Sequence, residues 1–177
     1  MTGLDWTMAG VRVLGQGSAE TEASLPPRQA QKASAYADPL AWLLLDAVER
    51  TLAPCRDAVL AAHATVGQIV VSDLCTLPTM RHIARDLARN RLSPLRFSGA
   101  CPGLICSVPA QQFRFNGPSL VLSMPPESGM TYAALLARDW LHSAAASHVL
   151  LSAHHADAAG HRMVCTLLQA APEGVAP

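Results

Sequence analysis

The chain has 177 residues, of which half are apolar and 15% are charged, and this composition is typical of one globular domain spanning residues 1–177. It excludes an intrinsically disordered chain, which combines low hydrophobicity with high net charge. The 13 basic and 13 acidic residues balance each other. The chain therefore lacks the positive excess with which proteins follow a nucleic-acid backbone, and nucleic acid is not an expected partner.

The cysteines are odd in number and show no CxxC spacing; they are Cys55, Cys75, Cys101, Cys106 and Cys165. They are predicted to be free thiols in a reducing compartment, the cytoplasm. Residues 1–13 lack the basic and apolar regions of a secretory signal, and the longest apolar run, 40–45, is too short to cross a bilayer. No membrane association is expected.

The first quarter of the chain is predicted to contain one short strand and one helix. Residues 11–14 form an apolar strand that two glycines end, and the polar residues 19–37 form a surface loop. Asp38 is placed to cap a helix, and Pro39 suits its first turn. Apolar residues then recur at helical spacing as far as Leu52.

The middle of the chain is predicted to alternate buried strands with a helix. Residues 67–72 (GQIVVS) are largely apolar, as in a strand that is covered on both faces. A helix follows over 76–90, and residues 93–108 are predicted to be irregular because of their glycines and prolines. A second buried strand, SLVLSM, occupies 119–124.

The last third begins with two prolines at 125–126, which end that strand and suit the first turn of a helix over 127–143. Residues 148–152 form another buried strand, 162–169 a weakly alternating one, and 170–177 a loose tail. Strands that alternate with helices predict an α/β domain with a mixed sheet and helices on its faces.

Several segments carry a family resemblance. SPLRF at 93–97, followed by Pro-Gly at 102–103, resembles the SP..F....PN stretch of ketosynthases. FNGPSLVLS at 115–123 resembles their GLRGPSLTLS strand, and Ser-Gly at 128–129 resembles part of the ACxSGLxAL helix that carries their nucleophile. In this order and spacing, over residues 11–157, the segments resemble the amino-terminal half of a ketosynthase, which has a thiolase-like fold.

The departures from this pattern concern the reactive groups. In ketosynthases a cysteine stands three residues before the glycine of the Ser-Gly pair, where the amino end of the helix favours a thiolate. Here that position is Pro126, which has neither a nucleophile nor an N–H group. The family's histidines that stabilise the decarboxylating malonyl group lie in the second half of the fold, which this chain is expected to lack. The resemblance therefore implies a pseudo-ketosynthase that is not an enzyme.

Chain length factors are ketosynthase-like subunits that lack this cysteine and form heterodimers with active ketosynthases. The chain resembles a shortened version of them, similar to proteins of aryl-polyene-type and type II polyketide pathways, although full-length factors often carry Gln where Pro126 stands. The resemblance implies a non-catalytic subunit that stabilises the heterodimer and helps to shape the acyl tunnel. An acyl carrier protein is a further candidate partner, a homodimer is the alternative assembly of the chain alone, and no cofactor is expected.

Two sets of site residues follow from this resemblance. A strand that pairs antiparallel with the partner would consist of Ser119, Leu120, Val121, Leu122, Ser123 and Met124. Bulky side chains that reach toward the partner's acyl tunnel would limit the length of the product; the candidates are Phe97, Leu104, Ile105 and Phe113. Ordinary core packing is the alternative explanation for each of these four.

Two other functions stay open on the sequence. A small standalone acyl-thioester hydrolase or transferase would use Ser128 and Glu127, although the residues around Ser128 lack the first glycine of G-x-S-x-G. A self-associating scaffold that binds an acyl carrier protein is the other.

The most metal-like group consists of His154, His155, Asp157 and His161. Neighbouring residues of a strand point in opposite directions, so His154 and His155 are not expected to bind one ion together. This leaves His155 with His161 as the pair that could do so. Solvated or capping histidines are the alternative, and no metal is expected.

Overall fold

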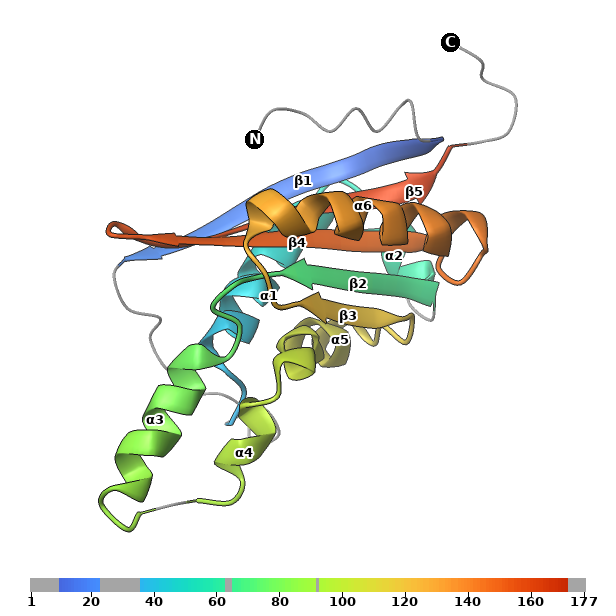
Figure 1. Cartoon of the computed structure of the whole chain (residues 1–177). Coiled ribbons are helices and arrows are strands. Elements are labelled where there is room, and N and C mark those ends of the chain that lie inside the picture. The colour runs from blue at the N-terminus through green and yellow to red at the C-terminus, as the bar shows by residue number, and fades with distance from the viewer. Residues whose placement is uncertain (1–9, 23–35, 63–64, 92, 172–177) are drawn as a thin grey trace.

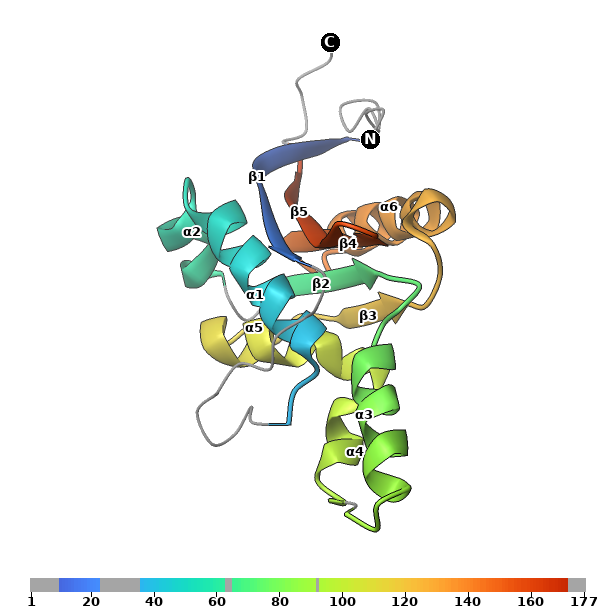
Figure 2. The ribbon, with the colours of Figure 1, turned by 90° about the vertical axis from the view of Figure 1, so that its left-hand side faces the viewer.

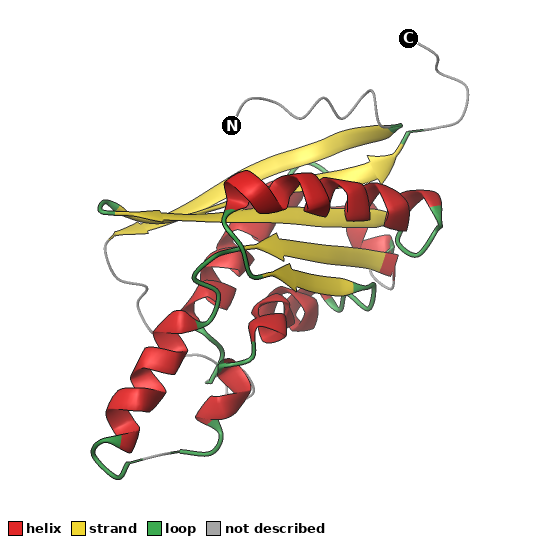
Figure 3. Ribbon diagram, in the orientation of Figure 1, coloured by secondary structure: helices red, strands yellow, loops and turns green. Residues whose placement is uncertain are grey.

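The computed structural model describes residues 10–22, 36–62, 65–91 and 93–171, which form one mixed sheet with helices on both faces (Figures 1 and 3). The strands are β1 (Val11–Glu22), β2 (Val66–Val71), β3 (Ser119–Leu122), β4 (His148–Asp157) and β5 (Gly160–Ala170). The helices are α1 (Pro39–Leu52), α2 (Arg56–Ala61), α3 (Leu77–Leu87), α4 (Arg96–Gly99), the 3-10 helix η3 (Pro102–Cys106), α5 (Ser107–Phe113) and α6 (Pro126–His142).

The sheet has the order β1-β5-β4-β2-β3, so β1 and β3 are its two edges. Strand β2 pairs in parallel with both β3 and β4, whereas β5 pairs antiparallel with both β4 and β1. All residues of β2 are buried, as the apolar run predicted, because helices cover both faces of a parallel sheet.

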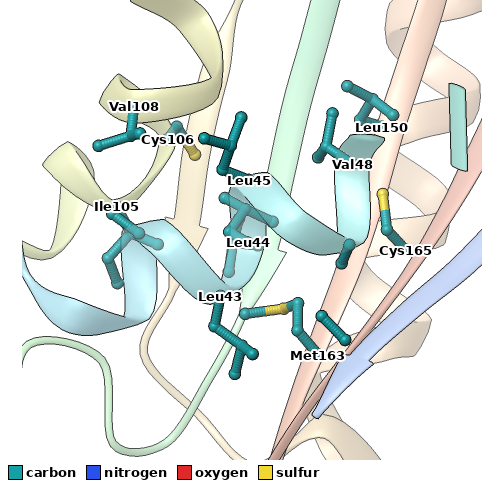
Figure 4. Packing of buried hydrophobic residues seen from close by; sticks show 14 of the residues in the cluster. Leu43, Leu44, Leu45, Val48, Ile105, Cys106, Val108, Leu150, Met163 and Cys165 are labelled. Atoms are coloured by element: carbon teal, nitrogen blue, oxygen red, sulfur yellow. The ribbon is translucent and has the colours of Figure 1, made fainter. Parts of the chain in front are cut away.

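Two hydrophobic clusters fill the two faces of the sheet. On one face α1 and α5 pack over Leu150 and Met163, and Figure 4 shows Leu43 and Val48 of α1 beside these residues. On the other face α6 packs over residues such as Leu151. Figure 2 shows α1 and α6 on opposite sides of the strands.

Asp38 caps helix α1, as predicted, and also ties it to α3. Its Oδ1 accepts a hydrogen bond of 2.8 Å from the Leu40 amide, and Pro39 occupies the first turn. Its Oδ2 accepts from the Thr79 amide at 3.3 Å. Burial raises the pKa of the Asp38 carboxyl, and the hydrogen bonds from Thr79 and Leu40 oppose this shift.

Strand β1 is longer than predicted. It pairs with β5 from Val11 opposite Ala170 as far as Glu22 opposite Gly160, so the predicted end at the glycines and the predicted loop over 19–37 are wrong for residues 15–22. The polar run has no hydrophobic alternation, and backbone hydrogen bonds to a strand at the far end of the chain hold it extended. Residues 23–35 of the predicted loop lie outside the described residues.

The two glycines of β1 allow α1 to cross the strand closely. A Cβ atom at Gly15 would lie 2.4 Å from the carbonyl oxygen of Thr51, and one at Gly17 would lie 2.6 Å from the Thr51 nitrogen. Any side chain at these positions would push the last turn of α1 away from the sheet.

The prediction that residues 93–108 are irregular is wrong, because this segment contains α4, η3 and the start of α5. Its prolines and glycines begin and end short helices instead of preventing them, with Pro102 at the start of η3. Helices α3 and α4 project away from the sheet (Figures 1 and 2). None of the helices in the described parts of the chain is long and apolar enough to span a membrane.

After β4 the chain turns back at once into β5. The Asp157 Oδ1 atom accepts hydrogen bonds from the amides of Ala159 (2.7 Å) and Gly160 (3.2 Å), which fixes the turn. The predicted strand over 162–169 is confirmed and extends to Ala170. The predicted tail is therefore wrong at residue 170, and residues 172–177 lie outside the described part of the chain.

We expect Gly17→Ala to lower the free energy of unfolding by about 1–3 kcal/mol, the usual cost of overpacking, because the new methyl group meets the backbone of Thr51. Urea unfolding followed by circular dichroism measures the change. Gly103→Ala is the control, since a Cβ atom there would approach only the Cys101 sulfur, at 4.0 Å. Equal stability of the two variants would contradict the close packing of α1 on β1.

Candidate functional site

The outer side of β3 is a free sheet edge. Pro118 and Leu122 use their carbonyl oxygens to accept hydrogen bonds from Gln68 (2.9 Å) and Ser72 (3.1 Å) on the β2 side. Because successive residues of an extended strand direct their backbone groups to opposite sides, Ser119 and Val121 direct theirs outward. In the described chain, β3 ends the sheet, so these outward groups meet no further strand.

The side chains of β3 alternate between the two clusters. Leu122 packs with the α6 cluster and Val121 with the α1 cluster, and both are only half-buried. The strand ends at Leu122, so the prediction of a six-residue strand is wrong for Ser123 and Met124, which lie in the turn toward α6. The two prolines that follow have no N–H to extend the ladder.

Helix α6 begins with Pro126, the residue at the position where the resemblance to ketosynthases would place a cysteine. Pro126 is buried in the first turn, and the amides of Ser128 and Gly129 both donate to the carbonyl of Pro125, at 3.0 and 2.8 Å. Gly129 has no space for a side chain, since a Cβ atom would lie 2.4 Å from Val71 Cγ1. The side chain of Pro126 itself has no group that could act as a nucleophile.

Ser128 and Glu127 are both exposed. Glu127 Oε1 lies 3.9 Å from His155 Nδ1 on β4, the only group within the described residues with which it forms an ion pair. The Ser128 hydroxyl has no hydrogen-bond partner among the described residues, so no base is placed to remove its proton.

The four acyl-tunnel candidates are divided between the core and the surface. Ile105 and Phe113 are buried in the α1 cluster, and Phe113 stacks on Phe115 with the ring centroids 5.3 Å apart. Phe97 on α4 and Leu104 on η3 are 51% and 43% exposed. The structure thus does not bring the four together in one cavity.

A hydrogen-bonded chain of side chains crosses the carboxyl ends of β2 and β4 and the amino end of β5. The Ser72 Oγ atom, after β2, lies 2.8 Å from His154 Nδ1 on β4, and His154 Nε2 lies 3.1 Å from His161 Nδ1 on β5. The Cys75 amide donates to the same Ser72 oxygen at 2.9 Å. Ser72 was not singled out in the sequence, and Cys75 was named there only as a free thiol.

The structure does not bring together His155 and His161, the pair that the sequence left open for a metal, because His161 faces His154. In the β4–β5 ladder His161 lies opposite Ala156, which shares a face with His154 and not with His155. Within the described residues, no group of three or more His, Cys, Asp or Glu side chains is arranged to hold a metal ion.

Two proton arrangements satisfy this chain, because the Ser72 oxygen can accept a second hydrogen bond besides the one from the Cys75 amide. In one, the Ser72 hydroxyl donates to His154 Nδ1, His154 Nε2–H donates to His161 Nδ1, and His161 carries its hydrogen on Nε2. In the other, all of these directions are reversed. Burial lowers the pKa of His154 to about 4, with repulsion from His161 and His155 adding to the shift and Asp73 opposing it. Burial also lowers the pKa of His161.

The sheet order, the helices on both faces and the turn from the edge strand into α6 form the thiolase-like fold of ketosynthases, as the sequence predicted. No family model matches the sequence, and no curated protein matches it. The likeness lies in solved structures that share less than a quarter of their residues with this chain, so it establishes the fold alone.

Three of these solved structures show how far the likeness in fold extends. The ishigamide ketosynthase/chain length factor superposes with a TM-score of 0.74 at 14% identity, over 95% of this chain and 64% of that chain. AntDE:AntF, a type II polyketide synthase acyl-carrier protein in complex with its ketosynthase, gives 0.66 at 13%, over 90% and 62%. The ketosynthase ApeO in complex with its chain length factor ApeC from Xenorhabdus doucetiae gives 0.61 at 14%, over 90% and 79%. The chain thus spans less than two thirds of the first two.

Acidification is expected to destabilise the protein through His154. The pKa of His154 is lower in the folded chain than its ordinary value of 6.5, so the unfolded chain binds the proton first and stability falls as the pH drops from about 6.5 toward 4. From pH 7 to pH 5 this group should contribute a loss of roughly 2 kcal/mol in the free energy of unfolding.

Urea unfolding at several pH values measures this loss. In His154→Gln, which keeps a hydrogen-bonding side chain but cannot titrate, the loss between pH 7 and pH 5 should be smaller by about 2 kcal/mol than in the unmodified chain. Parallel curves for the two proteins would show that His154 is not held neutral by burial.

Proposed function

We propose that the chain is a non-catalytic, chain-length-factor-like partner subunit of an active ketosynthase in polyketide or aryl-polyene/fatty-acid-type biosynthesis. The observation that carries this proposal is the free edge of β3, which leads directly into the first turn of α6 with Pro126 in place of a nucleophile. The likeness in fold to complexes of ketosynthases with chain length factors supports it. The five free cysteines support a reducing, cytoplasmic location.

A lack of condensing chemistry follows from the residues at α6. A condensing nucleophile at the amino end of a helix would be activated by the helix dipole and nearby amides. Pro126 supplies neither a sulfur nor an amide there, and it is buried. In the heterodimer the partner ketosynthase therefore supplies all of the acyl chemistry.

Pairing through β3 suits the edge that the chain presents. A short strand with outward N–H and C=O groups at Ser119 and Val121 can accept an antiparallel strand from the partner, which satisfies these groups and joins two sheets. The half-buried Leu120, Val121 and Leu122 would become buried at the same time. Permanent complexes of this kind bury above about 2,000 Å² and are largely apolar.

Of the tunnel candidates, Phe97 and Leu104 are the two that can shape a partner's acyl tunnel. Both are large apolar side chains that stay exposed in the single chain, whereas Ile105 and Phe113 already stabilise the core around α1. Phe97 and Leu104 would limit the length of the product by steric exclusion, and the partner would cover them.

We expect co-expression with a partner ketosynthase to give a stoichiometric complex, which Val121→Pro abolishes. The substitution removes one outward amide from the middle of the edge strand without removing a hydrogen bond to β2. Val121→Thr keeps the amide and the branched side chain and should retain the complex. Size-exclusion chromatography with light scattering measures assembly.

Circular dichroism of each variant separates loss of pairing from loss of folding. Ser119→Pro removes the other outward amide, at the first residue of the strand, and replaces Val121→Pro as the test if that variant unfolds. A folded proline variant that still forms the complex would place the interface elsewhere. A wild-type chain that stays monomeric beside the ketosynthase, or captures only the acyl carrier protein, would favour a different assembly.

The alternative function, a standalone thioester hydrolase or transferase, leads to a different expected result. We expect no release of free thiol from acyl or malonyl thioesters by the chain alone, because Ser128 has no base beside it among the described residues. A thiol-release assay of the wild type, Ser128→Ala and Glu127→Gln measures this. Turnover that falls about a hundredfold or more in these variants would establish Ser128 and Glu127 as catalytic residues.

A further inference from the structure

We propose that a pocket between α3 and the β4–β5 hairpin binds a small amphipathic anion, with its phosphate or carboxylate head held by Arg81, Arg85 and His161. The pocket has a volume of about 540 Å³ and is lined by Leu74, Leu77, Pro78, Arg81, Ala84, Arg85 and His161. This inference does not depend on the proposed partner.

The two arginines supply a positive charge that the chain leaves uncompensated. Arg81 and Arg85 are one helical turn apart on the same side of α3, both are exposed, and neither forms an ion pair within the described residues. Like charges at this spacing destabilise a helix. The acidic residue of α3, Asp86, lies instead 3.0 Å from His82 and 3.7 Å from Arg96.

The lining of the pocket contains no acidic side chain. Asp73 precedes Leu74 in the chain but does not take part in the lining. A second hollow, which His161 also lines, includes Glu20 and Asp157 together with Arg162, and these carboxylates would repel an anion. The charges therefore favour an anion in the first pocket and not in the second.

His161 adds a neutral donor to the arginine pair. The site requires the tautomer in which His161 Nδ1 accepts from His154 Nε2–H, which leaves Nε2–H as the remaining polar group of a ring that lines the pocket. In this tautomer the Ser72 hydroxyl donates to His154 Nδ1 while the Ser72 oxygen accepts from the Cys75 amide. An N–H donor in the same pocket as two planar guanidinium groups suits the oxygen atoms of a phosphate or carboxylate.

The rest of the lining is apolar, and it favours a ligand whose other half is apolar as well. Leu74, Leu77, Pro78 and Ala84 form a surface on which a short hydrocarbon group would be removed from water. A ligand with a charged head and a short apolar tail therefore fits better than an inorganic anion or a neutral alcohol.

The test is a titration of the ¹⁵N-labelled chain at constant ionic strength. The chain is used alone if it is soluble, and otherwise in a complex that keeps it soluble. The probes are inorganic phosphate, hexyl phosphate, hexanoate and hexanol. We expect hexyl phosphate or hexanoate to bind at least about tenfold more tightly than inorganic phosphate and hexanol, and to shift the ring resonances of His161. The tighter of the two identifies the preferred head group. Hexanol binding as tightly as the anions would overturn the proposal.

Variants locate the site. Arg81→Gln combined with Arg85→Gln should weaken binding of the better anion about tenfold or more. Arg89→Gln, which removes an exposed charge just beyond α3, should leave it unchanged. Equal losses in the two variants, or none in the double variant, would overturn the proposal. So would ¹⁵N shifts that place the His161 proton on Nδ1.

Discussion

The parallel pairing of β2 with both β3 and β4 is the constraint from which the candidate sites follow. Parallel neighbours cannot be joined by a tight turn, so the chain must cross over after β2 and again after β3. The first crossover contains α3, α4, η3 and α5, and it leaves α3 projecting beside the carboxyl end of β2. The second contains α6 and places Pro126 at the carboxyl end of β3. Both the arginine pocket and the place of Pro126 in the fold are consequences of these crossovers.

The two prolines separate the edge strand from the helix that follows it. Strand β3 ends at Leu122, where the Met124 amide donates to the Leu122 carbonyl oxygen. Pro125 and Pro126 have no amide with which the ladder could resume, and they suit the first turn of α6, whose amides need no partner within the helix.

The sequence predicted those elements whose signal is local. The buried run 67–72 became β2, the two prolines began α6, and Asp38 with Pro39 began α1. It failed where the structure depends on residues far apart in the chain. The polar half of β1 is extended only because β5 pairs with it, and the partner of His161 depends on the register of the hairpin that Asp157 turns. Phe97 and Leu104 are exposed whereas Ile105 and Phe113 are buried, and this difference likewise depends on how α4, η3 and α5 pack.

The buried histidine chain explains how the pocket on α3 could work near neutral pH without a titrating group. Because burial lowers the pKa of His154 to about 4 and also lowers that of His161, both rings are neutral near pH 7, and in the tautomer that the proposed site requires Nε2 of His161 is a donor. The positive charge then comes from Arg81 and Arg85, which do not titrate in this range. None of the pocket's lining residues comes from β3 or α6. A strand paired at β3 would use a different set of residues from an anion bound beside α3, so each of the two proposals can fail while the other holds.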